Sequence, residues 1–379
     1  MNNVIFLDNA STSPMSVKSA EIYRQFSCDN FYNPSAIYSQ GANMQNEIKN
    51  AKIKVAKSLG TTFNQNIVFC GSATECNNLA ILGSYRKNFG KMLFGIGEHP
   101  AVYNTAMHLK NIGADVEFVA LQQTGEIDYE DLKSKLTSDT SFISIMHVSN
   151  ETGAINNLKK IADIKNQICP NAIFHSDGVQ AFGKTKVNVE YFGVDMYTIS
   201  AHKINGPKGV GALYVKNLNL LTPIIFGGGQ EYNLRSGTEN VGGIMAFCNA
   251  IDEIGDVKQN QRHLTNLKDV FIKNLNASNV KVNSYGLPHI LSLSFEGVNG
   301  ETLVHMMEQK NILISRGSAC SSKKAGNRVL ENMGLKSEQI LGSVRISFSK
   351  YNTPEEVAHA AKTLGECYNS LIRTLHNKI

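Results

Sequence analysis

Apolar runs typical of buried β-strands alternate with helix-like runs through the first two thirds of the chain. We expect strands at residues 66–70, 91–96, 115–120, 141–148, 172–176 and 196–200, and helices at 74–85 and about 100–111. Several of these strands are apolar at consecutive positions, as in a sheet that helices cover on both faces. The alternation favours βα units and a mostly parallel sheet. In such sheets, binding sites lie beyond the carboxyl ends of the strands.

The last third of the chain has a different pattern. It combines a long polar helical run, a strand with alternating polarity, a second helix, a short strand and a terminal amphipathic helix, at residues 252–276, 289–295, 301–309, 344–348 and 355–375. We therefore expect a large α/β domain over residues 13–255 and a smaller α+β domain made of residues 1–12 and 256–379. The boundary near residue 255 rests on pattern alone.

Composition excludes several classes of protein. Of the 379 residues, 42% are hydrophobic and 18% charged, which is typical of a globular chain. The net charge of +5 comes without a basic run, so direct nucleic-acid binding is not expected. No apolar stretch is long enough to span a membrane, and the N-terminus does not resemble a signal peptide. We therefore expect a cytoplasmic protein.

The seven cysteines fit that compartment. Their number is odd and their spacing wide, and no C-x-x-C pair occurs. This argues against a disulfide framework and against a zinc site, so no resident metal is expected.

Two residues at expected strand ends have the chemistry needed for pyridoxal phosphate. Lys203 follows the strand at 196–200 and could form a Schiff base. Asp177 ends the strand at 172–176 and could pair with a protonated pyridine nitrogen. Each also has an ordinary reading, a surface lysine in a turn and a helix-capping aspartate.

Other polar residues follow the same strand ends. The segment 71–75, which includes Ala73 and Thr74, starts a helix and could bind a phosphate. An ordinary helix start would explain this segment equally well. Ser200 and His202 could bind the same phosphate. His99 could stack on a flat ring and exchange protons, while Asn150 and Gln180 could bond a ring oxygen. Each of these is ambiguous alone.

Two further residues stand out against their neighbours. Cys320 lies in a small, polar, cationic segment at about 315–328, where Arg316, Lys323 and Lys324 could favour its thiolate. Arg345 interrupts an apolar strand and could hold a substrate carboxylate through two parallel bonds or form a structural ion pair.

Taken together, these pieces resemble the cysteine desulfurases, which are pyridoxal-phosphate enzymes with the aminotransferase-like fold of type I. The resemblance covers nearly the whole chain in order, through LDNA at 7–10, NPS at 33–35, ATE at 73–75, EH at 98–99, NETG at 150–153, HSD at 175–177, SAHK at 200–203, GGGQE at 227–231, RSGTEN at 235–240 and GSACSS at 317–322. It implies a large domain with a seven-stranded, mostly parallel sheet. The SACSS motif is similar to that of the subgroup with a long cysteine loop, which serves iron–sulfur assembly and tRNA thiolation.

The resemblance also implies a role for each matching residue. Lys203 would be the Schiff-base lysine, Asp177 the partner of the pyridine nitrogen, and His99 the stacking residue. The remaining roles are phosphate binding (Ala73, Thr74, Ser200, His202, and Thr238 across a homodimer), contact with the ring oxygen (Asn150, Gln180), binding of the substrate carboxylate (Asn33, Arg345) and sulfur acceptance (Cys320). No permanent metal is implied, although Cys320 could contact an iron–sulfur cluster transiently during transfer.

The implied reaction converts L-cysteine to L-alanine and leaves a persulfide on Cys320. The sulfur would pass to an iron–sulfur scaffold, a tRNA sulfurtransferase or a relay protein. A selenocysteine lyase or another C–S lyase with the same cofactor remains the alternative, and so does a scaffold protein without activity. The chain departs from the family pattern at Tyr38, Ser149, Arg316 and Ser349, with Lys350 following. These departures leave the acceptor open and remove no catalytic group.

Overall fold

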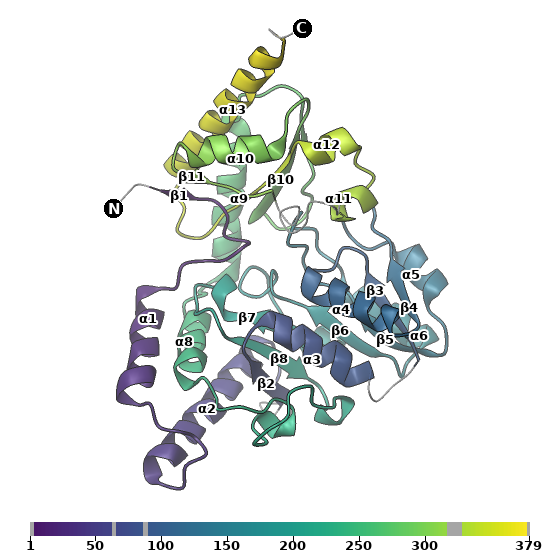
Figure 1. Ribbon diagram of the computed structural model, residues 1–379, viewed down its shortest axis with the longest axis vertical. Helices are drawn as coiled ribbons and strands as arrows, with labels where there is room; N and C mark the ends of the chain where they lie inside the picture. The colour runs from purple at the N-terminus through teal and green to yellow at the C-terminus, as the bar shows by residue number, and fades with distance from the viewer. Residues whose placement is uncertain (1–3, 63–65, 86–89, 317–327, 377–379) are drawn as a thin grey trace.

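The computed structural model describes residues 4–62, 66–85, 90–316 and 328–376 (Figure 1). The large lower part contains a seven-stranded sheet in the order β2-β8-β7-β6-β5-β3-β4. Its strands are β2 (Ile67–Cys70), β3 (Lys91–Gly95), β4 (Val116–Val119), β5 (Thr140–Ser144), β6 (Ile173–Asp177), β7 (Met196–Ser200) and β8 (Gly211–Val215). Only β8 runs against its neighbours, so the other six strands end at one edge.

Both faces of this sheet are apolar because alternate residues of each strand point to opposite sides. On one side, Phe94 and Met196 pack against helices α3 (Ala73–Tyr85) and α4 (Pro100–Asn111). On the other side, Leu93 and Tyr197 pack against helices that include α2 (Ser39–Ser58), α6 (Leu158–Ile168) and α8 (Val241–Asp252). The consecutive apolar residues that predicted a sheet buried on both faces therefore serve two separate cores.

The small upper part has its own core. Strands β9 (Val280–Val282), β10 (Ile290–Phe295) and β12 (Ser343–Ser347) form an antiparallel sheet, and β1 (Ile5–Phe6) pairs with β11 (Ile312–Leu313). The sheet packs against helices α9 (Val257–Asn274), α10 (Gly300–Glu308) and α13 (Pro354–His376). Residues from both ends of the chain share this core, and both ends lie in this part of the molecule (Figure 1). The domain boundary near residue 255 remains a prediction.

Shorter elements complete the described chain. They are α1 (Val17–Arg24), η1 (Gln25–Asp29), α5 (Tyr129–Lys135), α7 (Val189–Phe192), η3 (Ala201–Lys203), η4 (Leu218–Leu220), η5 (Glu231–Asn233), α11 (Arg328–Asn332) and α12 (Ser337–Leu341).

Two predicted elements were wrong in extent. The helix expected at 252–276 starts later, at Val257, because α8 ends at Asp252 and Asp256 caps the start of α9 by accepting from the amides of Lys258 and Gln259. The strand expected at 141–148 ends at Ser144, and the apolar residues that follow it lie in the loop that leads to the site. No helix over the described residues combines the length and apolarity needed to cross a bilayer.

Candidate active site

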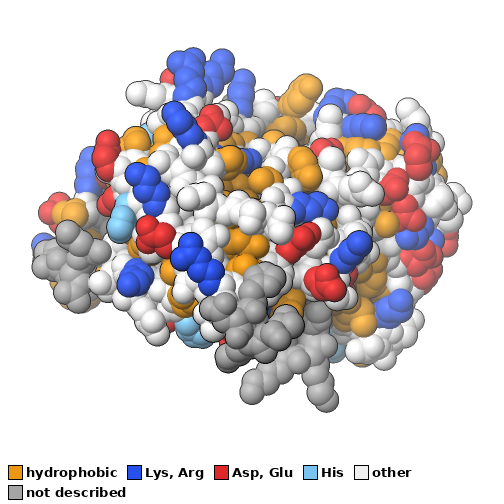
Figure 2. Space-filling model, turned by 90° about the horizontal axis from the view of Figure 1, so that it is seen from above, with side chains coloured by type: hydrophobic (Ala, Val, Ile, Leu, Met, Phe, Trp, Pro, Cys, Tyr) orange, Lys and Arg blue, Asp and Glu red, His pale blue; other side chains and the backbone are white. Residues whose placement is uncertain are grey.

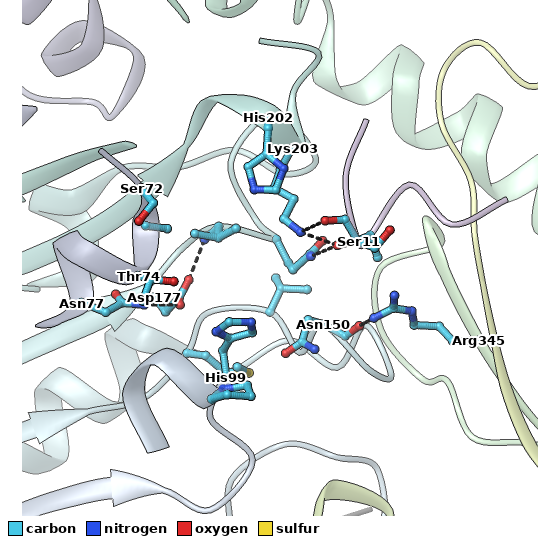
Figure 3. A pocket seen from close by; sticks show the side chains of 17 residues that line it. Ser11, Ser72, Thr74, Asn77, His99, Asn150, Asp177, His202, Lys203 and Arg345 are labelled. Carbon is cyan, nitrogen blue, oxygen red and sulfur yellow. Dashed lines mark hydrogen bonds between the residues drawn. The ribbon is translucent and has the colours of Figure 1, made fainter. Parts of the chain in front are cut away.

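A cavity of about 450 Å³ lies where the six strands end, beneath the small upper part. Figure 3 shows the side chains that line it, which come from both parts of the molecule. Nine of the predicted site residues are among them: Ala73, Thr74, His99, Asn150, Asp177, Gln180, His202, Lys203 and Arg345. Residues more than 300 positions apart in the sequence thus meet around one space.

Lys203 ends the short helix η3 directly after β7. Its Nζ donates to the main-chain oxygens of Ala10 and Ser11, both at 2.6 Å (Figure 3). Burial and, to a smaller extent, the charge of Arg345 together lower the pKa of this amine to about 8, against the opposing effects of Asp8 and Asp177. A lysine with such a pKa is neutral often enough near neutral pH to act as a nucleophile or a base.

Asp177 is fixed by two donors. Its Oδ2 accepts from Asn77 Nδ2 at 2.7 Å, and its Oδ1 accepts from the main-chain N–H of Val179 at 3.0 Å. No helix starts at Val179, so the helix-capping explanation of this aspartate is wrong. Asp177 is 6% exposed, and its free surface lines the cavity. The carboxylate is therefore held in one orientation beside the space.

The ring of His99 is also held in one orientation and in one tautomer. His99 caps α4, and its Nδ1 accepts from the main-chain N–H of Ala101 at 3.1 Å. An Nδ1 that accepts carries no proton, so the proton of the neutral ring is on Nε2. Burial lowers the pKa of His99, and the charges of Lys203 and Arg328 add to this effect while Asp177 opposes it. The ring is exposed to the cavity as a neutral imidazole, which suits stacking on a flat ligand.

The start of α3 forms one wall. Ser72, Ala73 and Thr74 line the cavity at the helix N-terminus, where free N–H groups favour an anion. Gly211 of β8 lies against this turn, and a Cβ there would come within 2.7 Å of the Ser72 carbonyl carbon. His202 faces the same cavity, and burial lowers its pKa to about 4, so it is neutral.

Arg345 of β12 enters the cavity from the small upper part. Its NH2 pairs with Asp8 Oδ1 at 2.8 Å, and its NH1 donates to the main-chain oxygen of Asn150 at 2.7 Å. Its Nε is buried and has no hydrogen-bond partner among the described residues. This arginine therefore forms the structural ion pair that was one of its two predicted roles, and its binding of a substrate carboxylate stays a prediction.

Gln180 uses its amide for contacts within the protein. Its Nε2 donates to the oxygen of Ala10 at 2.9 Å, and its Oε1 faces His289 Nε2 at 3.4 Å. One N–H of the amide remains for a ligand.

Three predicted residues among those that the structure describes do not line the cavity. Ser200 is buried at the end of β7, while Asn33 and Thr238 are exposed elsewhere on the same chain. Asn33 Oδ1 instead accepts from the main-chain N–H of Ser35 at 2.9 Å. Cys320 lies outside the described residues, so its predicted role remains a prediction.

Sequence reasoning missed several contributors to the cavity, three of which act through polar groups. Ala10 and Ser11 act through main-chain oxygens, which carry no residue-specific signal. Asn77 lies on the second turn of α3, and its helical spacing after the 71–75 segment could have suggested that it faces the strand ends.

Comparison with known proteins identifies the family. The model of the family described as "Aminotransferase class-V" matches residues 5–359. The chain belongs to the class-V aminotransferase family. Curated relatives include "Cysteine desulfurase IscS" of Dictyoglomus turgidum, 35% identical over 96% of this chain and 94% of the relative. Another is "Cysteine desulfurase IscS 1" of Archaeoglobus fulgidus, 36% identical over 95% of each chain.

Solved structures of this family have the same fold. A "NifS-like protein" superposes with a TM-score of 0.91 at 30% identity, covering 97% of this chain and 100% of its own. A structure titled "SspA in complex with cysteine" has a TM-score of 0.82 at 31% identity, covering 92% of this chain and 100% of its own. The predicted α/β fold with a mostly parallel seven-stranded sheet is confirmed.

Proposed function

We propose that the protein is a pyridoxal-phosphate-dependent cysteine desulfurase that removes sulfur from L-cysteine and releases L-alanine. The observation that carries the proposal is the meeting of Lys203 and Asp177 in one cavity, with the amine pKa lowered to about 8 and the carboxylate fixed by two donors. The names of the curated relatives support the same activity.

The residues present fit this cofactor. Asp177 offers a fixed carboxylate for a pyridine nitrogen, and His99 presents a neutral ring for stacking. The α3 N-terminus with His202 offers donors for a phosphate. Lys203 would hold the cofactor covalently through its amine.

When bound, pyridoxal phosphate supplies an electron sink for the pair released at the substrate α-carbon. Arg345, which lines the cavity, would bind the substrate carboxylate. The free amine of Lys203 would take the proton from the substrate α-carbon, for which a pKa of about 8 is suited. The Nδ1 of His99 is occupied by the Ala101 N–H, so His99 would stack on the ring system and only its Nε2 would be left to exchange a proton.

Cys320 would attack the substrate sulfur as a thiolate. The new S–S bond gives a persulfide on Cys320 as the substrate C–S bond breaks, and its electron pair stays with the carbon skeleton that becomes alanine. The persulfide would then pass to an acceptor protein, such as an iron–sulfur scaffold, a tRNA sulfurtransferase or a relay protein.

We also propose a cytoplasmic homodimer. Thr238 is exposed and does not line the cavity of its own chain, as expected for a residue that serves the partner's cofactor. Large apolar side chains are exposed on the same part of the molecule, including Ile37 and Phe226. A second copy of the chain would cover them.

The deciding experiment measures alanine released from L-cysteine with a reductant present. The cofactor-loaded protein is compared with its Cys320→Ala variant, and Cys28→Ala, at an exposed cysteine, is the matched control. We expect alanine and sulfide from the unmodified protein and the control and neither from Cys320→Ala.

Other outcomes would redirect the assignment. Alanine from all three proteins would indicate a lyase that does not need Cys320, and activity with L-selenocysteine would then separate the selenocysteine lyases. Partner binding without alanine from any of them would indicate a scaffold and refute the proposed function.

A further inference from the structure

Arg328 extends from α11 to the turn that carries His99. Its Nε donates to the main-chain oxygen of Ile96 at 2.6 Å, and its NH2 donates to the main-chain oxygen of Glu98. Its guanidinium carbon lies 3.6 Å from the centre of the Tyr103 ring, on the first turns of α4. One side chain therefore holds the two carbonyls that bracket Gly97 and the helix that His99 caps.

The turn needs such support because of its own sequence. It runs Gly95-Ile96-Gly97-Glu98, and two glycines in four residues leave the main chain unusually free. The turn has three other hydrogen bonds. The Glu98 N–H donates to the oxygen of Gly95 at 3.2 Å, the Ile96 N–H donates to the oxygen of Val119 at 2.9 Å, and the buried Glu98 carboxyl accepts from the N–H of Met146. The charged fork of Arg328 supplies two strong bonds to this short segment.

We propose that Arg328 is a positioning residue for His99: it fixes the glycine-containing turn so that the imidazole stays beside the cavity with Nδ1 on the Ala101 N–H. The expected effect on catalysis rests on the proposed function, whereas the positioning of the turn rests on geometry alone. Arg328 itself does not line the cavity.

The role can be separated from general stabilisation. Val329, Leu330 and Met333 are buried in a small apolar cluster with Leu121, so α11 stays attached to the large part without the arginine. Loss of the guanidinium should therefore loosen the turn and leave the helix in place.

The test compares Arg328→Leu, Arg328→Lys and the control Arg262→Leu, which replaces an exposed arginine on α9. Amide hydrogen exchange in the cofactor-free protein is the first measurement, because the Ala101 N–H reports directly on its bond to His99. We expect exchange at Ala101 to become on the order of tenfold faster in Arg328→Leu, since an opened bond exposes the amide. Arg328→Lys should give an intermediate rate and Arg262→Leu no change.

Kinetics with L-cysteine give the second measurement. A displaced His99 should lower kcat on the order of 10- to 100-fold with a smaller effect on KM, because a misplaced group affects the reacting geometry more than substrate capture. Arg328→Lys should restore part of kcat.

Unchanged exchange at Ala101 in Arg328→Leu would overturn the inference. If Arg328→Leu does not fold, unchanged exchange and kcat in Arg328→Lys would overturn it equally. Faster exchange together with no alanine from the unmodified protein would leave the positioning role standing and refute the proposed function, so the two failures are distinguishable.

Discussion

The lowered pKa of Lys203 gives the most direct physical test of the site. Its pKa of about 8 lies well below the value of 10.5 for a free lysine. This corresponds to about 3 kcal/mol against the charged amine. At pH 7 about a tenth of the amine would be neutral, against about 0.03% for an ordinary lysine.

Competitive acetylation of the cofactor-free protein can measure this value. Trace acetic anhydride reacts only with neutral amines, so the labelling rate of each lysine between pH 6 and 11 follows its titration. Peptide mass spectrometry would compare Lys203 with exposed Lys208 as a rate reference. Lys184 is a second test, because burial and the charge of Lys350 lower its pKa to about 8 as well. We expect both buried amines to have midpoints near pH 8.

Charge-removing variants separate the causes of the shift. Arg345→Met removes a positive charge that opposes protonation of Lys203, so the midpoint should rise. Asp177→Asn removes a negative charge that favours protonation, so the midpoint should fall. A unit charge roughly 10 Å away at an effective dielectric of about 20 contributes about 1.7 kcal/mol, which predicts a change of about one pH unit in each case.

The direction of the Lys203 pKa shift also predicts how the stability of the protein depends on pH. Because the folded-state pKa is lowered, the folded protein binds fewer protons than the unfolded chain between about pH 8 and 10.5, and the penalty is complete below pH 8. The stability of the protein relative to Lys203→Met should therefore rise as pH rises through this window. A midpoint for Lys203 near 10 in the labelling experiment would refute the reasoning.

Three further predictions concern the surroundings of the site. Asn77→Leu removes a 2.7 Å bond to the Asp177 carboxylate and should weaken pyridoxal phosphate binding about 10- to 100-fold, measured by fluorescence titration, with unchanged affinity contradicting the role. Lys52→Met leaves the buried Glu231 carboxylate without its partner at 2.7 Å and should lower the free energy of unfolding in urea by about 3–5 kcal/mol. The double variant with Glu231→Gln should recover part of this loss, and additive losses would refute the pairing. Gly286→Ala places a Cβ 1.9 Å from the Gly153 oxygen and should lower the free energy of unfolding by about 2–3 kcal/mol. Gly255→Ala has open space around it but a φ of +67°, and should lower the free energy of unfolding by about 1 kcal/mol. Equal losses in thermal unfolding would contradict this prediction.

The sequence predicted the parts of the site that depend on one residue at one strand end. Asp177 ends a strand whose apolar run is visible in the sequence, Lys203 and His99 each follow such a strand, and parallel strands bring their carboxyl ends together. That logic places residues on the edge of the sheet and gives no orientation of their side chains.

Contacts between distant segments could not be predicted in this way. The pairing of Asp8 with Arg345 joins residues 337 positions apart, and neither side chain has a neighbour in the sequence that indicates the other. The tautomer of His99 depends on one main-chain N–H of the helix that it caps. Arg328 acts through carbonyls, which every residue has, so only the structure could reveal its target.

The segment from Asp8 to Ser13 links both parts of the molecule to the reactive amine. On one side, Asp8 pairs with Arg345, and the N–H of Ala10 donates to Ser347 Oγ at 2.9 Å. On the other side, the oxygen of Ala10 accepts from Lys203, and Ser13 Oγ donates to the oxygen of His202 at 2.8 Å. A shift of the small upper part along β12 would therefore move the acceptors of the Lys203 amine as well as the arginine proposed to bind the substrate carboxylate. Because both groups depend on one short segment, their positions relative to the substrate are coupled through the main chain near Ala10.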